Sequence, residues 1–143
     1  MQYARDFFTF SLICDGREIA TPLAVSCAAA GCAPIHHCTA IWDTGATSSM
    51  ISADLAKELN LEPEGTVKVS GVHGVEEAKV YTIDLIFGTG FKIEKLQVSE
   101  AGNNAGFDVL IGMDVISKGV FFINGGNHAE KGCQIAFAFP ANS

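Results

Sequence analysis

The chain has 143 residues, 48% of them hydrophobic and 17% charged, which is typical of one globular domain and excludes a disordered or fibrous protein. Its net charge of −7, without a run of Lys or Arg, argues against nucleic acid as a partner, because that affinity comes largely from basic groups on phosphates. The N-terminal apolar residues are interrupted by charges and form neither a signal-peptide core nor a membrane span. We therefore expect a soluble, cytoplasmic protein with no membrane partner.

The first third of the chain has the pattern of β-strands separated by turn residues. Two apolar runs, 7–14 and 17–25, flank an Asp-Gly pair that favours a tight hairpin turn. Residues 26–38 are small, Cys- and His-containing and include a proline, which predicts a loop insertion. The run 39–42 then resumes as a strand that leads directly into Asp43.

The middle of the chain changes from helical to β periodicity. Residues 52–61 carry Leu55 and Leu59 at helical spacing behind Ser52, a favourable N-cap residue, and predict a short helix. Residues 66–88 alternate apolar and polar side chains on both sides of a Gly-Val-His-Gly tip, and residues 91–100 alternate again. Three strands should follow the helix, the first two joined as a hairpin.

The last part of the chain returns to short strands and tight turns. We expect a loop at 101–106, an apolar strand at 107–112, a helical turn at 113–119 and a closing hairpin at 119–139. No linker or repeat divides residues 1–143, so they form one domain. Many short strands with one short helix predict an all-β fold, either a small barrel or a sandwich.

The stretch AIWDTGAT, residues 40–47, contains the most informative residues. Trp42 belongs to an apolar strand, yet the next residue is Asp43, whose charge is costly to bury without a partner. Asp-Thr-Gly is also ordinary turn chemistry, because Asp accepts backbone hydrogen bonds and Gly tolerates a positive φ. Asp43 therefore either caps a turn or takes part in a reaction, and its setting must decide.

That setting resembles the retropepsin-like aspartic proteases, the single-domain relatives of the retroviral proteases. The similarity rests on Asp-Thr-Gly-Ala at 43–46, a Gly-tipped hairpin, and Leu-Ile-Gly at 110–112, in that order, and it extends over 7–139. The resemblance implies a small closed barrel that is active as a two-fold dimer. It also implies an aspartic endopeptidase that acts on a peptide or protein substrate and needs no cofactor.

The number of Asp-Thr-Gly motifs explains why a dimer would be required. Hydrolysis without a metal or covalent nucleophile needs a base to activate water and an acid to protonate the departing amine, and two carboxyls that share one proton can do both. The chain has one such motif. A homodimer would therefore bring together two copies of Asp43, and catalysis would depend on association.

The resemblance also implies roles for the neighbouring residues. Thr44 would hydrogen-bond across the dyad, and the Gly45 amide would orient the carboxylate. Trp42 departs from the smaller aliphatic residue expected before the Asp, and we expect it to pack in the core beneath the dyad. The hairpin tip would act as a flap over the substrate. The residues expected to line the substrate site are Ala46, Gly71, Val72, His73, Gly74, Val75 and Ile111. For His73, a solvated loop position is favoured over a substrate contact.

A competing group of residues lies in the 26–38 loop. Three cysteines there, Cys27, Cys32 and Cys38, stand beside His36 and His37, but their spacing lacks the close C-x2-C pair of structural zinc sites. We expect no metal and reduced cysteines; in an exported protein, a bridge from Cys27 to Cys32 or to Cys38 becomes plausible.

Two other functions therefore remain open beside the endopeptidase. The first is a non-catalytic module of the same fold that dimerises or binds peptides, because a fold alone does not guarantee activity. The second is a small metal-binding β domain built on the Cys- and His-containing loop. The intact Asp-Thr-Gly favours the endopeptidase over the metal-binding domain, whereas an inhibitor and a cleavage assay at acidic pH would separate the endopeptidase from the non-catalytic module.

Overall fold

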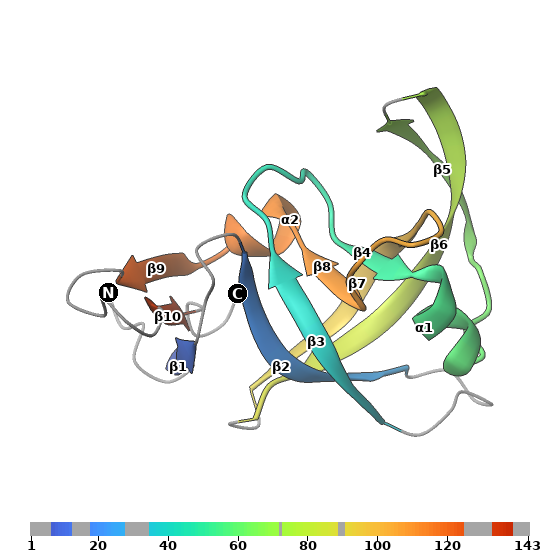
Figure 1. Ribbon diagram of the computed structural model, residues 1–143. Helices are drawn as coiled ribbons and strands as arrows, with labels where there is room; N and C mark the ends of the chain where they lie inside the picture. The colour runs from blue at the N-terminus through green and yellow to red at the C-terminus, as the bar shows by residue number, and fades with distance from the viewer. Residues whose placement is uncertain are drawn as a thin grey trace.

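The computed structural model describes residues 7–12, 18–27, 35–71, 73–88, 91–124 and 133–138. Within these residues the chain forms strands in two sheets and two short helices (Figure 1). The elements are β1 (Phe7–Leu12), β2 (Ile19–Ser26), β3 (His36–Trp42), β4 (Met50–Ser52), α1 (Ala53–Glu58), β5 (Gly65–Gly71), β6 (Gly74–Ile86), β7 (Lys92–Ala101), β8 (Val109–Ile111), α2 (Met113–Ile116), β9 (Val120–Asn124) and β10 (Cys133–Ala138).

Six strands of the larger sheet form a ring. Their order is β2-β3-β8-β4-β7-β6, and β6 returns to pair with β2, so that Ala24 lies opposite Ile86. The β3–β8 and β4–β7 pairs are parallel, and the other pairs are antiparallel. β5 pairs only with the first half of β6, and this hairpin extends beyond the ring at the upper right of Figure 1.

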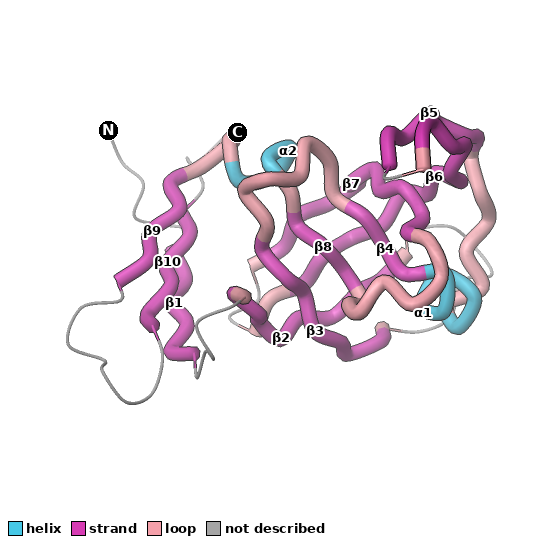
Figure 2. Tube along the Cα trace, turned by 45° about the horizontal axis from the view of Figure 1, so that its top comes forward, coloured by secondary structure: helices cyan, strands magenta, loops and turns pink. Residues whose placement is uncertain are grey.

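The smaller sheet has the order β1-β10-β9 and stands beside the ring, as Figure 2 shows. The predicted N-terminal hairpin is therefore wrong. β1 pairs with β10, with Phe7 opposite Ala138, whereas β2 pairs with β3 and β6. An Asp-Gly pair favours a turn locally, but strand partners are decided by packing between distant segments. The hairpin predicted at 119–139 is confirmed by the antiparallel pairing of β9 with β10.

Aromatic side chains join the two sheets. Trp42 at the end of β3 is 4% exposed, and its ring centroid lies 5.3 Å from that of Phe121 and 5.2 Å from that of Phe137. The indole Nε1–H donates to the hydroxyl of buried Thr21 at 2.9 Å, so the polar end of the ring is satisfied. As predicted, Trp42 is a core residue, and it directly precedes Asp43.

The predicted helix is present but shorter than expected. α1 begins after Ser52, whose hydroxyl accepts from the backbone N–H of Leu55 at 3.1 Å, and this confirms the N-cap. The chain leaves the helix at Asn60, which has φ of 53°. α2 is the helical turn expected after residue 112, so the fold is mostly β with two short helices.

The predicted 26–38 loop is also shorter than expected. β2 extends through Ser26 and β3 begins at His36, because Val25 pairs with His36 and Ser26 pairs with Asp84 of β6. Residues 28–34 lie outside the described part. None of the helices in the described residues is long and apolar enough to span a membrane.

Candidate active site

The parallel pairing of β3 with β8 brings the two predicted motifs together. Trp42 lies opposite Ile111, and the backbone N–H of Asp43 donates to the Ile111 carbonyl at 2.9 Å. The motifs are more than sixty residues apart in the sequence, and only this pairing makes them neighbours. Asp43 therefore leaves the sheet at a position set by the pairing of β3 with β8.

The turn after β3 orients the Asp43 carboxylate. The backbone N–H of Gly45 donates to Asp43 Oδ1 at 2.8 Å, and the N–H of Ala46 donates to the Asp43 carbonyl at 3.2 Å. A Cβ on Gly45 would lie 3.1 Å from the same Oδ1, so the glycine permits the close approach of backbone and carboxylate. Asp43 is half-buried and Thr44 is exposed. The second carboxylate oxygen is thus in a position where solvent or substrate can approach.

Gly112 ends β8 at a point where there is no room for a side chain. An added Cβ would meet the Ala46 carbonyl oxygen at 2.8 Å and the carbonyl group of Ser48 at 2.9 Å, both of them backbone. The N–H of Met113 donates to the Ala46 carbonyl at 2.8 Å. The loop that carries Asp43 therefore packs directly on the backbone between β8 and α2.

Sequence reasoning missed a polar network that holds the far side of this loop. Asp114 accepts from the Ser49 hydroxyl at 2.7 Å and from the Ser49 N–H at 2.9 Å. The same hydroxyl accepts from the Gly112 N–H at 3.0 Å, and Ser49 is completely buried. The sequence showed an Asp on each side of the Leu-Ile-Gly motif, Asp108 and Asp114. That Asp114 pairs with Ser49 became visible only in the fold. These hydrogen bonds attach the end of the loop to the backbone between β8 and α2.

The predicted flap residues lie on the β5–β6 hairpin, away from the strands that carry Asp43. Gly71 pairs with Gly74, His73 is exposed, and Val75 is 66% exposed. Val72 lies outside the described residues. Figure 1 shows this hairpin and the loop after β3 both extending from the upper end of the ring. The hairpin predicted from the sequence is confirmed, and its role as a flap stays a prediction.

Ile111 and Leu110 face opposite sides of β8. Ile111 is completely buried, whereas Leu110 is half-buried and pairs with Ile41 and Met50. The Ile111 side chain therefore lies in the core, and its expected substrate contact stays a prediction. Leu110 is the residue of the motif with a side chain accessible from outside, and alternation along a strand could have indicated this.

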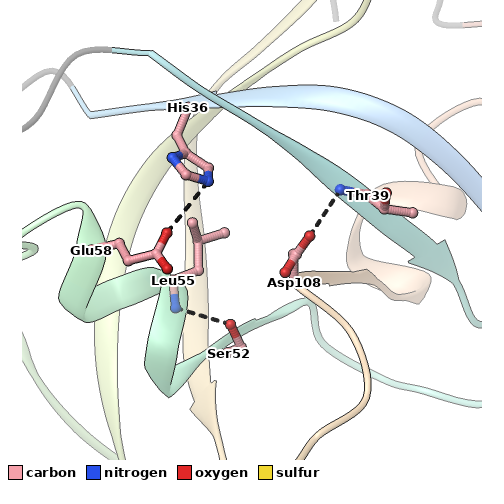
Figure 3. Close-up of polar contacts among 6 residues, drawn as sticks. All are labelled: His36, Thr39, Ser52, Leu55, Glu58 and Asp108. Carbon is pink, nitrogen blue, oxygen red and sulfur yellow. Dashed lines mark hydrogen bonds and ion pairs between the residues drawn. The ribbon is translucent and has the colours of Figure 1, made fainter.

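A separate cavity of about 650 Å³ lies on the outer face of β3, and Asp43 does not line it. Its lining residues are Glu18, Ala20, Thr39, Ile41, Ser52, Ala53, Asp54, the loop 102–107 and Asp108. Figure 3 shows how polar contacts shape this region: Asp108 accepts from the Thr39 N–H at 3.1 Å, and His36 lies 3.4 Å from Glu58. These contacts attach β3 to its neighbours, and the His36–Glu58 pair is exposed enough to add little stability.

The Cys- and His-containing segment is only partly described. Cys27 is disulfide-bonded, which contradicts the expectation that all cysteines are reduced. Cys38 is free, so it is not the partner of Cys27; burial, followed by the nearby Asp108 charge, raises the pKa of its thiol to about 12. Cys32 and Cys14 lie outside the described residues. Among the residues that are described, no group of three metal-binding side chains occurs.

Comparisons with known proteins agree with this geometry. Residues 25–115 match the family model described as aspartyl protease. A retropepsin-like aspartic protease from Rickettsia conorii has a similar structure, with a TM-score of 0.62 and 14% identity over 93% of this chain and 90% of that one. The simian foamy virus protease aligns with a TM-score of 0.44 and 20% identity over 66% of this chain and 89% of its own. No curated protein sequence matches. This chain therefore belongs to the aspartyl protease family and has the retropepsin-like fold.

Proposed function

We propose that the protein is an aspartic endopeptidase whose active site forms between two copies of the chain. Each copy would contribute one Asp43 carboxylate, and the pair would hold a water molecule between them. The observation that carries the proposal is the hydrogen bond from Gly45 N–H to Asp43 Oδ1, which orients a half-buried carboxylate at the end of a parallel strand pair.

The chemistry follows from two carboxyls that share one proton. The ionised carboxylate removes a proton from the water, whose oxygen attacks the scissile carbonyl carbon. The protonated carboxyl donates its proton to the carbonyl oxygen, which gives a neutral tetrahedral diol. Proton transfer to the amide nitrogen then allows the C–N bond to break, and the pair is left with its single proton restored. One chain alone has one such carboxyl, so it cannot complete this cycle.

The substrate would be an extended peptide segment. One face of the β5–β6 hairpin carries Val67, Val69 and Ala78 together with Glu76, whereas the other face pairs Lys68 with Glu77. An extended chain could bind beneath such a hairpin through main-chain hydrogen bonds, with alternate side chains entering pockets on either side. Gly71, His73, Gly74 and Val75 would then contact substrate from above, and Ala46 from below.

The experiment compares Asp43→Asn with Asp54→Asn on an unfolded protein substrate at acidic pH. Asp54 is an exposed carboxylate in the first turn of α1, so its variant controls for the loss of one charge. Asp43→Asn should abolish cleavage and leave the thermal midpoint unchanged or raised, whereas Asp54→Asn should cleave normally. Cleavage by purified Asp43→Asn would refute the proposal.

A dilution series tests whether the site is shared between chains. Specific activity should fall as the concentration passes below the dimer dissociation constant measured by sedimentation, because mass action removes the second carboxylate. Constant specific activity at concentrations where only monomer sediments would contradict a shared site. A folded dimer that binds the peptide without cleaving it would instead support a non-catalytic binding module.

The expected cytoplasmic location is a weaker proposal. The disulfide at Cys27 counts against it, because structural disulfides persist mainly in oxidising compartments. Mass mapping of the protein isolated from its native cells under thiol-blocking conditions would decide between the cytoplasm and an oxidising compartment. A free Cys27 thiol would support the cytoplasm.

A further inference from the structure

The cavity on the outer face of β3 has walls from several segments of the chain. β3 lies between β2 and β8 in the ring, and Ala20 of β2 lies opposite Ile41, so that both line the cavity. Thr39 and Ile41 share this face because side chains alternate along a strand, whereas Ala40 between them is completely buried. The volume of about 650 Å³ lies within the range of about 300–1,000 Å³ that is typical of ligand pockets.

The same alternation places the cavity beside Asp43. Asp43 follows Ile41 by two residues, so the two side chains leave the chain on one side, about 7 Å apart along the strand. Glu18 precedes β2, and the register that pairs Ile19 with Trp42 continues from Glu18 to Asp43. Alternate side chains of an extended peptide have the same spacing of about 7 Å. A substrate residue within about two positions of the scissile bond would therefore reach the cavity.

The cavity combines apolar side chains with exposed carboxylates. Ile41 and Phe107 are half-buried, whereas Glu18 and Asp108 are exposed. Of the described residues that line the cavity, none is Lys, Arg or His. Lys and Arg side chains bury their aliphatic stems on apolar surface and keep their charged heads in polar surroundings. The lining therefore suits a long cationic side chain.

Glu18 and Asp108 approach β3 from its two neighbouring strands, and neither has a cationic partner among the described residues. Asp108 Oδ2 accepts from the Thr39 N–H at 3.1 Å, and Figure 3 shows the other oxygen pointing away from Thr39. The third lining carboxylate, Asp54, lies in the first turn of α1, where the helix N-terminus stabilises its charge. Glu18 and Asp108 are thus the two carboxylates that a bound cation would neutralise.

We propose that this cavity binds a Lys or Arg side chain of the peptide substrate, with the cationic head between Glu18 and Asp108 and the aliphatic stem on Ile41. The inference rests on the proposed function, and it adds the class of peptide that the site selects: one with a basic residue within about two positions of the scissile bond. The net charge of −7 favours the approach of such a peptide. An apolar side chain in the same place would leave both carboxylates without a partner.

The first test maps cleavage sites in a library of random peptides at a pH of about 6, at which ordinary carboxylates are ionised. Lys or Arg should be enriched at one position within two residues of the cleaved bond. In a peptide made from the preferred sequence, replacing that residue by norleucine keeps the aliphatic stem and removes the charge. The replacement should lower kcat/KM at least about fivefold, as expected for two partly exposed ion pairs. Cleavage sites without this enrichment would overturn the inference.

The second test uses Glu18→Gln and Asp108→Asn, because asparagine keeps an oxygen that accepts from the Thr39 N–H. Each variant should lower the lysine-to-norleucine ratio of kcat/KM by about half, and the double variant should bring it close to one. Glu18→Lys should instead favour a peptide with glutamate at that position, a gain that a folding defect cannot produce. The same substitutions at Glu62, an exposed residue outside the cavity, should leave the ratio unchanged. An unchanged ratio in the double variant and in Glu18→Lys would overturn the inference.

Affinity selection separates this inference from the proposed chemistry. Immobilised Asp43→Asn protein should retain library peptides with Lys or Arg at one position, and the Asp43→Asn protein that also carries Glu18→Lys should retain peptides with glutamate there. If the wild-type protein cleaves nothing but this selection is observed, the proposed function fails and the preference of the cavity stands. If Asp43→Asn abolishes cleavage but neither cleavage nor retention favours a basic residue, the inference fails and the proposed function stands.

Discussion

The Asp43 loop and the β5–β6 hairpin differ in how their conformations are held. The loop is bonded to β8 and α2 through Asp43 and Ala46, and Gly112 approaches it without room for a Cβ. The hairpin is mostly exposed, and a Cβ on Gly74 would meet nothing within 4 Å. The comparison teaches that this fold holds the Asp43 loop by close backbone packing and leaves the tip of the β5–β6 hairpin exposed. Substitutions in the two regions should therefore have opposite effects on stability and turnover.

Gly112→Ala should have the largest effect on the free energy of unfolding. Its Cβ would overlap backbone atoms of Ala46 and Ser48, which cannot rotate away, and overpacking of this kind costs about 3 kcal/mol. Chemical denaturation would measure the loss. Gly102→Ala is the matched control, because a Cβ there meets nothing within 4 Å. Equal stability of the two variants would show that the loop can relax away from α2.

Asp114→Ala should have the next largest effect. It removes the acceptor of two hydrogen bonds from buried Ser49, and leaving such donors unpaired costs about 2 kcal/mol. Cleavage should weaken as well, through kcat rather than KM, because the Asp43 loop loses a support without losing a substrate contact. Glu62→Ala, an exposed carboxylate after α1, should change stability by less than about 0.5 kcal/mol. An Asp114→Ala protein with wild-type stability and kcat would refute the positioning role.

Gly74→Val should show the reverse pattern, with a small loss of stability and a large loss of turnover. Gly74 has φ of 108°, a conformation that a β-branched residue adopts poorly, but the surrounding space is open and the strain is about 1 kcal/mol. If the hairpin closes over substrate, kcat/KM should fall on the order of tenfold. Gly65→Val, at the base of the same hairpin and without a positive φ, should cleave normally. Normal turnover by folded Gly74→Val would show that the hairpin is not a flap.

Cys38 should produce the smallest effect, a change in the pH dependence of stability. The native pKa of its thiol is about 12 and its ordinary value is 9.0, so between these values the native state binds more protons than the unfolded state. The free energy of unfolding should be fully maintained below pH 9 and fall as the pH rises toward 12. The free energy of unfolding of Cys38→Ser, measured by urea titration, should fall less steeply over this pH range. If stability falls equally steeply with pH in the two proteins, the pKa of the Cys38 thiol is not raised in the native state.

The Asp43 loop was the part of the molecule that the sequence predicted best. Asp43 and Gly45 are two residues apart, so the orienting hydrogen bond is a local interaction that the motif itself specifies. The same holds for Ser52, whose hydroxyl caps α1 within one turn. Local interactions of this kind depend on the conformation of only a few residues, and both are present in the fold.

The strand that pairs with β1 could not be predicted from local sequence. The Asp-Gly pair predicted a hairpin with β2, but β1 joins β10 from the other end of the chain. Strand pairing has a period of two and little specificity of its own, so several apolar strands satisfy β1 equally well on sequence grounds. The Ser49–Asp114 network escaped prediction for a similar reason, because its members are 65 residues apart.

By itself, the sequence determined the Asp-Thr-Gly motif, the turn that orients the Asp43 carboxylate, the helix cap and the hairpin with its Gly-rich tip, because each depends on neighbours within a few residues. Only the tertiary structure decided that Ile111 lies beneath Asp43, that Asp114 supports Ser49, and that Glu18 and Asp108 line one cavity on β3. These features depend on which distant strands pair, and that choice is made by burial of the whole core around Trp42, Phe137 and their neighbours. Burial is a property of the assembled chain, which no single segment encodes.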